Sequence, residues 1–472
     1  MTRISNAACH GRELVPASRR EMLQRSVQGF GWLAASSLLA QDQATGLAGA
    51  MQQLSHSPTA NNVVFLFMAG GPSHVDTYDP KPELTRLDGQ TTPESIQKHF
   101  QASAVQGNGT RRLMASPFRF RQFGESGQWG STLVEQTARH IDDLCIVRSL
   151  QHDTVIHVPG EYVMTTGTIG GDRPSLGAWV NYGLGSENQN LPGFVVLGGG
   201  PRPTCASGFL PSRTQGTMIQ NAADGIPNLN MPHGVSVEDR EDQLDLIGRL
   251  NSRHLHRIAS PDTELEARIR SYELAFRMQM AAPEAFDFVQ ETEATRRLYG
   301  LDHDQTRKVG TQCLLTRRLI ERGVRFIQLR VDGWDSHDDL IGGHSAAAGK
   351  SDKPIAGLIS DLRQRGLLDS TLLVWGGEFG RTPGVEKKGG RDHSPGGFTM
   401  WLAGGGIRGG QTIGATDEVG YTAIDRVVTP ADFHATILHA LGINQHDLHF
   451  EHRGRKEIPT FNGGDVLQEA FA

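Results

Sequence analysis

The stretch that decides the fold is Leu372-Leu373-Val374-Trp375-Gly376-Gly377-Glu378-Phe379-Gly380-Arg381-Thr382-Pro383, followed closely by Arg391-Asp392-His393-Ser394-Pro395-Gly396-Gly397. The apolar run at 372–375 is typical of a buried strand, and it ends at two glycines and a carboxylate. Open α/β sheets present reactive residues at the carboxyl ends of their strands in this way. Because Glu378, Asp392 and His393 carry groups that ligate divalent cations, our working hypothesis is a metal-assisted hydrolase site.

The chain is long enough for more than one hydrophobic core. Its 472 residues predict either one large α/β domain with insertions or two coupled domains. The 57 glycines indicate many tight turns, and they dilute the apolar content to 37% without indicating disorder. The net charge of -6 is spread along the chain and leaves no basic footprint, so we expect no nucleic-acid partner.

The first 50 residues have the features of a targeting segment. Ser18-Arg19-Arg20-Glu21-Met22-Leu23 resembles the twin-arginine export pattern, and a moderately apolar run at 29–40 follows it. This run is too short and too weakly apolar to be a stable membrane anchor. We therefore expect export by the twin-arginine route to the periplasm or the cell exterior. An N-terminal amphipathic helix is the alternative.

Other predicted strands also end in clusters of candidate metal ligands. The apolar run at 62–68 opens into a loop with His74 and Asp76, and a strand at 324–329 precedes Asp335 and His337. Carboxylates and imidazoles that alternate within one turn suit a divalent metal, whereas an acidic surface loop is the alternative. The predicted metal ligands, or partners of ligands, are His74, Asp76, Asp335, His337, Glu378, Asp392 and His393.

A further predicted strand, at 144–147, leads into Arg148 and then His157. Pro159 suits the first turn of a helix that runs to Thr166, so His157 is expected just before a helix N-terminus. The backbone N–H groups of such a terminus favour an anion. The remaining predicted elements are strands at 194–197 and 398–403, and helices at 131–142, 175–184, 304–322, 354–366 and from 430 onward.

Strands that alternate with helices, with polar clusters at strand ends, predict a doubly wound, mostly parallel sheet with helices on both faces. We expect this α/β domain to cover residues 60–466. Residues 198–235 are rich in Gly, Pro and Asn, and the pattern up to residue 298 is helical and highly charged. The segment 198–300 is therefore expected to be a helical and loop-containing cap or insertion.

The motifs together resemble a secreted bacterial family called domain of unknown function 1501, which is grouped near the sulfatases in the alkaline phosphatase-like superfamily. The resemblance covers nearly all of the chain after the leader and rests on residues 67–77, 333–337, 375–383 and 391–393. It implies an alkaline phosphatase-like or sulfatase-like fold and bound divalent metal ions, with zinc, calcium and manganese as candidates. It implies no firmly assigned activity.

The wider superfamily holds its metal with Asp and His side chains at strand ends. By this resemblance, Glu378 takes the place of the aspartate of an Asp-His-Gly motif, and His393 lies near a later ligand histidine. Asp335 and His337 match the carboxylate and the histidine of the other metal.

Two departures from the superfamily pattern bear on the chemistry. Gly70 and Gly71 stand where the first strand normally ends in a ligand aspartate, so His74 or Asp76 would have to substitute. In the register of the sulfatase pattern Cys-x-Pro-x-Arg, this chain has a histidine, His157, in place of the cysteine and a glutamate in place of the arginine. Formylglycine chemistry is therefore excluded at this position.

Three functions remain open on this basis. The first is an exported metal-dependent hydrolase of phosphate or sulfate esters, small-molecule or glycan, that uses metal-activated water or an unusual nucleophile. Its expected catalytic groups are His157 as nucleophile or proton donor, and Arg381 or Arg148 as a bidentate clamp for the anion. The second is a catalytically degenerate binding or structural protein that retains a metal site. The third is a hydrolase that uses Ser73 or Ser149, although the sequence contains no Gly-x-Ser-x-Gly elbow.

Overall fold

The structure, a computed structural model, describes residues 54–97, 111–188, 190–222, 236–257, 284–461 and 463–471. The predicted leader, 1–50, lies outside these residues, as do parts of the predicted insertion at 198–300. The described strands include eight that form one sheet in the order β12-β4-β11-β8-β1-β7-β5-β6. Their bounds are Asn62–Ala69 (β1), Leu144–Leu150 (β4), Phe194–Leu197 (β5), Thr217–Ile219 (β6), Phe326–Asp332 (β7), Thr371–Gly376 (β8), Phe398–Ala403 (β11) and Gln411–Ile413 (β12).

The sheet is mixed but mostly parallel. Strand β1 lies between β7 and β8 and runs parallel to both, and β5 runs parallel to β7 and β6. Strand β11 runs antiparallel to both of its neighbours, β4 and β8, so that β4 points in the same direction as β8. The carboxyl ends of β4, β8, β1 and β7 therefore meet at one edge of the sheet, as the sequence predicted.

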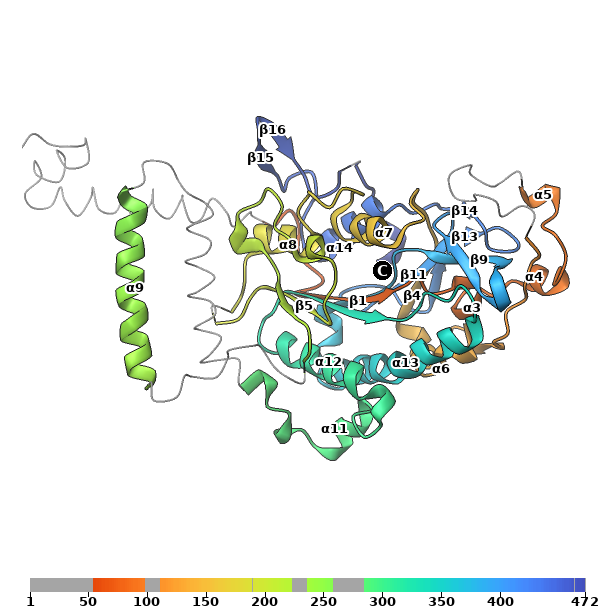
Figure 1. Cartoon of the computed structure of the whole chain (residues 1–472), viewed down its shortest axis with the longest axis horizontal. Coiled ribbons are helices and arrows are strands. Elements are labelled where there is room, and N and C mark those ends of the chain that lie inside the picture. Colours follow the sequence, from red (N-terminus) through yellow and green to blue (C-terminus); the bar gives the residue numbers. More distant parts are fainter. Residues whose placement is uncertain are drawn as a thin grey trace, which may run out of the picture. The chain divides into compact units, whose positions relative to one another are not determined.

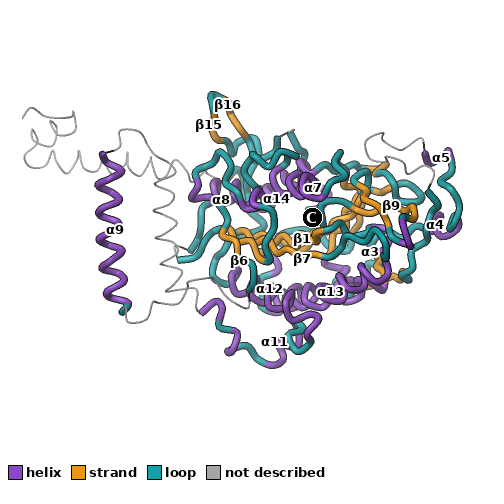
Figure 2. Tube along the Cα trace, viewed as in Figure 1, coloured by secondary structure: helices purple, strands orange, loops and turns teal. Residues whose placement is uncertain are grey.

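Helices cover both faces of the sheet (Figures 1 and 2). Val64, Leu66 and Met68 of β1 pack into the core on one side, whereas Val63 and Phe65 pack into the core on the other. This burial on both faces explains the unbroken apolar run of β1 and confirms the doubly wound α/β class. One face carries α7 (His157–Thr166), α8 (Leu176–Leu184) and α14 (Pro430–Ala440), and the other carries α6 (Glu135–Ala138), α12 (Asp304–Ile320) and α13 (Leu340–Gln364).

The start of α14 follows local sequence rules. Thr429 is its N-cap, Pro430 occupies the first turn, and the side chains of Thr429 and Asp432 form a capping box. This confirms the predicted start of the last helix.

The prediction of a helix at 354–366 was wrong at its start. Helix α13 begins at Leu340, where the Asp339 side chain accepts a hydrogen bond from the Gly342 N–H, and it continues through Pro354. The buried face of α13 includes Leu340, Ala347 and Ile355, so its packing extends across the proline and outweighs the lost helix hydrogen bond. His344 consequently lies on this helix.

Two other expectations differ from the structure. The helix expected at 131–142 is interrupted, because only α6 is α-helical and short 3₁₀ turns flank it. Strand β6 lies in a segment expected to be loop. The remaining elements are α3 (His74–Thr77), α4 (Pro82–Arg86), α5 (Glu94–Gln97), α9 (Val237–Arg257), α11 (Glu293–Leu298), β2 (Phe120–Phe123), β3 (Gln128–Ser131), β9 (Gly380–Val385), β10 (Arg391–Ser394), β13 (Ala415–Thr416), β14 (Ala423–Asp425), β15 (Phe450–His452) and β16 (Arg455–Glu457).

Helix α9 confirms that the charged segment after residue 237 is helical. No helix in the described parts of the chain combines the length and the hydropathy needed to cross a bilayer.

Candidate metal centre

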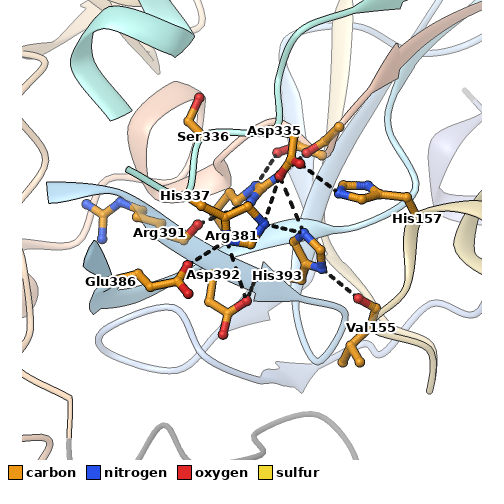
Figure 3. Close-up of polar contacts among 12 residues, drawn as sticks. Val155, His157, Asp335, Ser336, His337, Arg381, Glu386, Arg391, Asp392 and His393 are labelled. Atoms are coloured by element: carbon orange, nitrogen blue, oxygen red, sulfur yellow. Dashed lines mark hydrogen bonds and ion pairs between the residues drawn. The ribbon is translucent and has the colours of Figure 1, made fainter. Parts of the chain in front are cut away.

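Four side chains meet at the carboxyl edge of the sheet, where the sequence predicted a site. They are Asp335 and His337 from the loop after β7, His393 from β10, and His157 from the first turn of α7 (Figure 3). One ligand atom from each of these residues lies within 4.8 Å of the others. We call this group the histidine centre.

The tightest contacts in the histidine centre join three of its members. His337 Nε2 lies 2.9 Å from His393 Nε2, and the two nitrogens lie 3.0 and 3.4 Å from Asp335 Oδ1. His157 Nε2 approaches the other carboxylate oxygen, Oδ2, at 3.2 Å. All three imidazoles thus direct Nε2 toward the same carboxylate.

The other nitrogen of each ring contacts a hydrogen-bond acceptor. His393 Nδ1 donates to the Val155 carbonyl at 2.6 Å, His337 Nδ1 to Glu386 Oε2 at 2.6 Å, and His157 Nδ1 to Glu378 Oε1 at 2.6 Å. A neutral imidazole that carries its proton on Nδ1 presents a lone pair at Nε2. When both rings are neutral, the Nε2 lone pairs of His337 and His393 face each other, an arrangement that a proton or a cation between them would stabilise.

The residues therefore fit a divalent cation. Histidine ligands of metals usually donate their second N–H to a carboxylate or a backbone carbonyl, and all three histidines do so here. Glu378 Oε2 is also buried, and among the described residues it has no hydrogen-bond partner. An unpaired buried polar atom is unfavourable, so this atom marks a place for a further partner.

The electrostatics of the centre favour positive charge. Burial lowers the pKa of His157, but the carboxylates of Asp335 and Glu378 outweigh it and raise this pKa to about 9. Partial burial raises the pKa of Asp335, but hydrogen bonds from His157 and His393 and the charge of Arg381 hold it well below its usual range. The centre thus attracts either protons or a cation, and Asp335 remains ionised at neutral pH.

Glu378 supports the centre from the turn after β8. Its side chain is fully buried, and Oε1 accepts both His157 Nδ1–H and the Gly70 N–H, the latter at 2.9 Å. The preceding Gly377 has no room for a side chain, because a Cβ there would lie 2.5 Å from the Met68 carbonyl oxygen. The glycine pair therefore lets the chain turn closely enough against β1 to deliver this carboxylate.

Arg381, predicted to clamp an anion, is fully buried and already surrounded by acceptors. Its guanidinium donates to the carbonyls of Gly70, Gly71 and Arg391 and to Asp335 Oδ1. Arg381 thereby fixes the orientation of Asp335 and holds the turn after β1 against the loop after β7. The second predicted clamp, Arg148, lies apart from the histidine centre, with Nε 3.7 Å from Asp79.

The structure places His74 and Asp76 outside the histidine centre. Asp76 forms an ion pair with Arg391 at 2.8 Å, in which both side chains are fully buried, and it also accepts from the Ser73 hydroxyl. His74 Nε2 lies 2.8 Å from the Gly420 carbonyl oxygen. Of the seven predicted metal ligands, the structure brings Asp335, His337 and His393 together, with Glu378 and Asp392 beside them.

The two serines of the third functional hypothesis do not face the centre. The Ser73 hydroxyl donates to Asp76 and the Ser149 hydroxyl donates to the Arg426 carbonyl, and both residues are fully buried. His344 accepts a hydrogen bond from the Ser73 backbone N–H and not from its hydroxyl, which donates to Asp76. Neither serine is arranged as an activated nucleophile.

Sequence reasoning missed two charged residues beside the centre. Glu386 accepts from His337, and Arg111 lies 2.9 Å from Asp392 Oδ2. Glu386 follows β9, which pairs with β10, and Gly389-Gly390 between the two strands is a hairpin signal that could have placed it near Asp392 and His393. Arg111 follows a segment with no periodic pattern, so no signal of this kind pointed to it.

Comparisons with known proteins found solved structures of low sequence identity and one family. Solved structures similar to this chain include PsFucS1 sulfatase from Pseudoalteromonas sp. (12% identity, 92% of this chain and 75% of that chain, TM-score 0.35). They also include alkaline phosphatase from the Antarctic bacterium TAB5 (9% identity, 83% of this chain and 100% of that chain, TM-score 0.34). A third is phosphonate monoester hydrolase SpPMH from Silicibacter pomeroyi (10% identity, 87% of this chain and 76% of that chain, TM-score 0.33).

No curated protein matches the chain. The family described as "Protein of unknown function (DUF1501)" matches residues 60–471, a range that includes the whole α/β domain expected at 60–466. The chain therefore belongs to the DUF1501 family.

Proposed function

We propose that this protein is a metal-dependent hydrolase of phosphate or sulfate esters, with the histidine centre as its active site. The proposal rests on one observation above all. Three imidazoles direct Nε2 toward one carboxylate, and each donates its Nδ1–H to an oxygen acceptor. Without a cation this arrangement is energetically unfavourable, and it is typical of a metal-binding site.

The donor set favours a transition metal such as zinc or manganese over calcium. Calcium prefers six to eight oxygen ligands, whereas imidazole nitrogens suit zinc and its neighbours. His337 Nε2, His393 Nε2 and Asp335 Oδ1 lie within 3.4 Å of one another and are the ligands that we assign. A bound divalent ion would polarise an ester oxygen and lower the pKa of a coordinated water.

His157 takes a different part in this proposal. Its Nε2 faces Asp335 Oδ2 rather than the three clustered ligand atoms, and its Nδ1 is held by the buried Glu378. A carboxylate behind an imidazole fixes the tautomer and stabilises the protonated ring, as in other acid–base pairs. We therefore assign His157 the transfer of a proton to the leaving-group oxygen, with Glu378 as its positioning partner.

Arg381 serves this site by orienting Asp335. Its N–H groups are directed to backbone carbonyls and to that carboxylate, so the bidentate anion clamp foreseen for it has no free donor pair facing the centre. The substrate that we propose is a small-molecule or glycan ester. The twin-arginine pattern at residues 18–23 supports export of the loaded protein.

Two variants separate the assigned roles. His393→Ala should lose both the bound metal and the turnover of aryl phosphates and sulfates, because it removes a ligand. His157→Gln should keep the metal content, measured by mass spectrometry of the dialysed protein, and lose most of the turnover. Loss of metal from His157→Gln would make His157 a ligand instead.

The wild-type protein decides between an enzyme and a binding protein. Turnover that requires zinc or manganese and disappears with a chelator supports the hydrolase. A protein that holds one of these metals tightly but hydrolyses no aryl phosphate, sulfate or phosphonate ester would instead favour a binding protein on the same fold.

A further inference from the structure

A second group of candidate ligands lies beside the histidine centre. His337, Glu386 and Asp392 have ligand atoms within 4.8 Å of one another, and this group shares His337 with the first (Figure 3). The group is either a site for a second ion or a support for the first ion. The contacts of its members distinguish these two possibilities.

The hydrogen bonds of His337 argue against a second ion. Its Nδ1 lies 2.6 Å from Glu386 Oε2 and 4.0 Å from Asp392 Oδ1. An ionised carboxylate only accepts hydrogen bonds, so Nδ1 carries the ring proton. His337 could ligate an ion in the second group only by losing that proton, because its Nε2 already faces Asp335 and His393.

Arg111 provides the positive charge that a second ion would otherwise supply. Its Nη2 lies 2.9 Å from Asp392 Oδ2 and 4.0 Å from Glu386 Oε1. All three side chains are largely buried, with 27%, 27% and 17% of their surfaces exposed for Arg111, Asp392 and Glu386. Opposite charges at this depth are screened less by salt than pairs on the open surface.

Asp392 also contacts the backbone of the second ligand histidine, His393. Its Oδ1 accepts the His393 backbone N–H at 2.8 Å, and its own N–H donates to the Thr382 hydroxyl at 3.2 Å. The two carboxylates beside Arg111 therefore hold one ligand each: Glu386 holds the ring of His337, and Asp392 holds the backbone of His393.

We propose that Arg111, Glu386 and Asp392 form a charge chain that orients His337 and His393 and excludes a second ion, so that the protein binds a single divalent ion. Glu386 and Asp392 are then positioning residues. This inference rests on the proposed metal centre and adds to it the number of ions and the way in which the ligands are fixed.

The number of bound ions tests the inference. Full-length protein stripped with a chelator is titrated with zinc, and bound zinc per folded protein is measured by calorimetry and elemental mass spectrometry. We expect one tight equivalent in the wild type. Glu386→Gln should also bind one, with an affinity about 10–100-fold weaker, because partners behind a ligand histidine typically contribute that much.

Each other result has a defined meaning. Two tight equivalents in the wild type, one of them lost in Glu386→Gln, would overturn the inference and leave the proposed hydrolase site intact. No bound zinc in the wild type, with manganese giving the same result, would overturn the proposed function as well.

Arg111 is tested by the same titration. Arg111→Gln leaves Glu386 and Asp392 without a counter-charge, so a second, weaker equivalent should appear, whereas Arg111→Lys should still bind one. Arg426→Gln is the matched control, because it removes a guanidinium that pairs with Glu469 rather than with a residue of the histidine centre, and it should bind as the wild type does. A single equivalent in Arg111→Gln, with wild-type thermal unfolding, would contradict the exclusion role.

Discussion

Two polar clusters follow neighbouring strands of the sheet, and their carboxylates have different partners. After β1, Asp76 is fully buried and paired with the fully buried Arg391, and His74 contacts a backbone carbonyl oxygen. After β7, Asp335 is 43% exposed and faces three imidazoles through their Nε2 atoms. The first cluster is neutralised by one buried ion pair. In the second, Asp335 also pairs with Arg381 at 2.6 Å, but three imidazoles converge on the same carboxylate. Residue type alone does not separate a structural cluster from a metal site; the partner of each charge does.

The largest difference should appear when a carboxylate in each cluster is neutralised. Asp335→Asn should weaken zinc binding by more than about 100-fold, since the loss of a partner behind a ligand alone costs about 10–100-fold. Zinc titration by calorimetry measures this. The exposed neighbour Asp338→Asn is the matched control and should bind zinc normally; unchanged affinity in Asp335→Asn would remove Asp335 from the ligand set.

The opposite pattern is expected for the cluster after β1. Asp76→Asn leaves Arg391 buried without its counter-charge, so the free energy of unfolding should fall by about 3–5 kcal/mol. Urea denaturation followed by circular dichroism measures the loss. Zinc bound per folded molecule should stay the same, and if zinc binding disappeared while the fold was kept, Asp76 would belong to the metal site.

His344 connects the two clusters and makes their contact sensitive to acid. It lies 3.0 Å from the Ser73 N–H through Nε2 and 3.0 Å from the Ser336 hydroxyl through Nδ1. Burial lowers its pKa to about 3, whereas an unfolded chain has a histidine pKa near 6.5. The unfolded state therefore binds more protons between these values, so this contribution to stability is complete above about pH 6.5 and is lost as the pH falls toward 3.

His344→Gln removes this titration. Its free energy of unfolding at pH 7 should drop by about 1–3 kcal/mol, because the buried Ser73 N–H loses its acceptor. Its stability should also fall less steeply than that of the wild type between pH 6.5 and 4, measured by urea unfolding at each pH. Equal pH slopes for the two proteins would show that His344 titrates normally in the folded state.

The smallest effect is expected for Ser73→Ala. This change removes a buried hydroxyl that donates to Asp76 and should cost about 1 kcal/mol of stability, measured by thermal unfolding. Metal content and ester turnover should be retained. A loss of turnover in a stable, metal-loaded Ser73→Ala protein would support Ser73 as the nucleophile.

Much of the fold was predictable because the central strands are buried on both faces. The runs at 63–69, 144–147 and 372–375 are apolar throughout, so their strand character needs no long-range information. Helix α14 was predictable from its capping residues. The start of α13 was not, because a helix that continues through Pro354 depends on packing against α12, which the local sequence does not report.

The residue types of the candidate site were predictable from the sequence. Which individual residues meet there was less predictable. The motifs contain Asp335, His337, Glu378 and His393, and the sheet brings their loops to one edge. The sequence analysis missed Glu386, Arg111 and the Val155 carbonyl. Each of these groups contacts another residue of the site, and these contacts form only when the chain folds.

By itself, the sequence determined the buried strands and the supply of carboxylates and imidazoles at their ends, because apolar runs and glycine turns act locally. Only the tertiary structure decided which of these charges are neutralised within the protein. Arg391 reaches Asp76 from more than 300 positions along the chain, whereas three histidines, two of them from distant segments, surround Asp335. The partners of a carboxylate are set by distance in space, and the carboxylate on which three imidazoles converge is the one that we propose binds a cation.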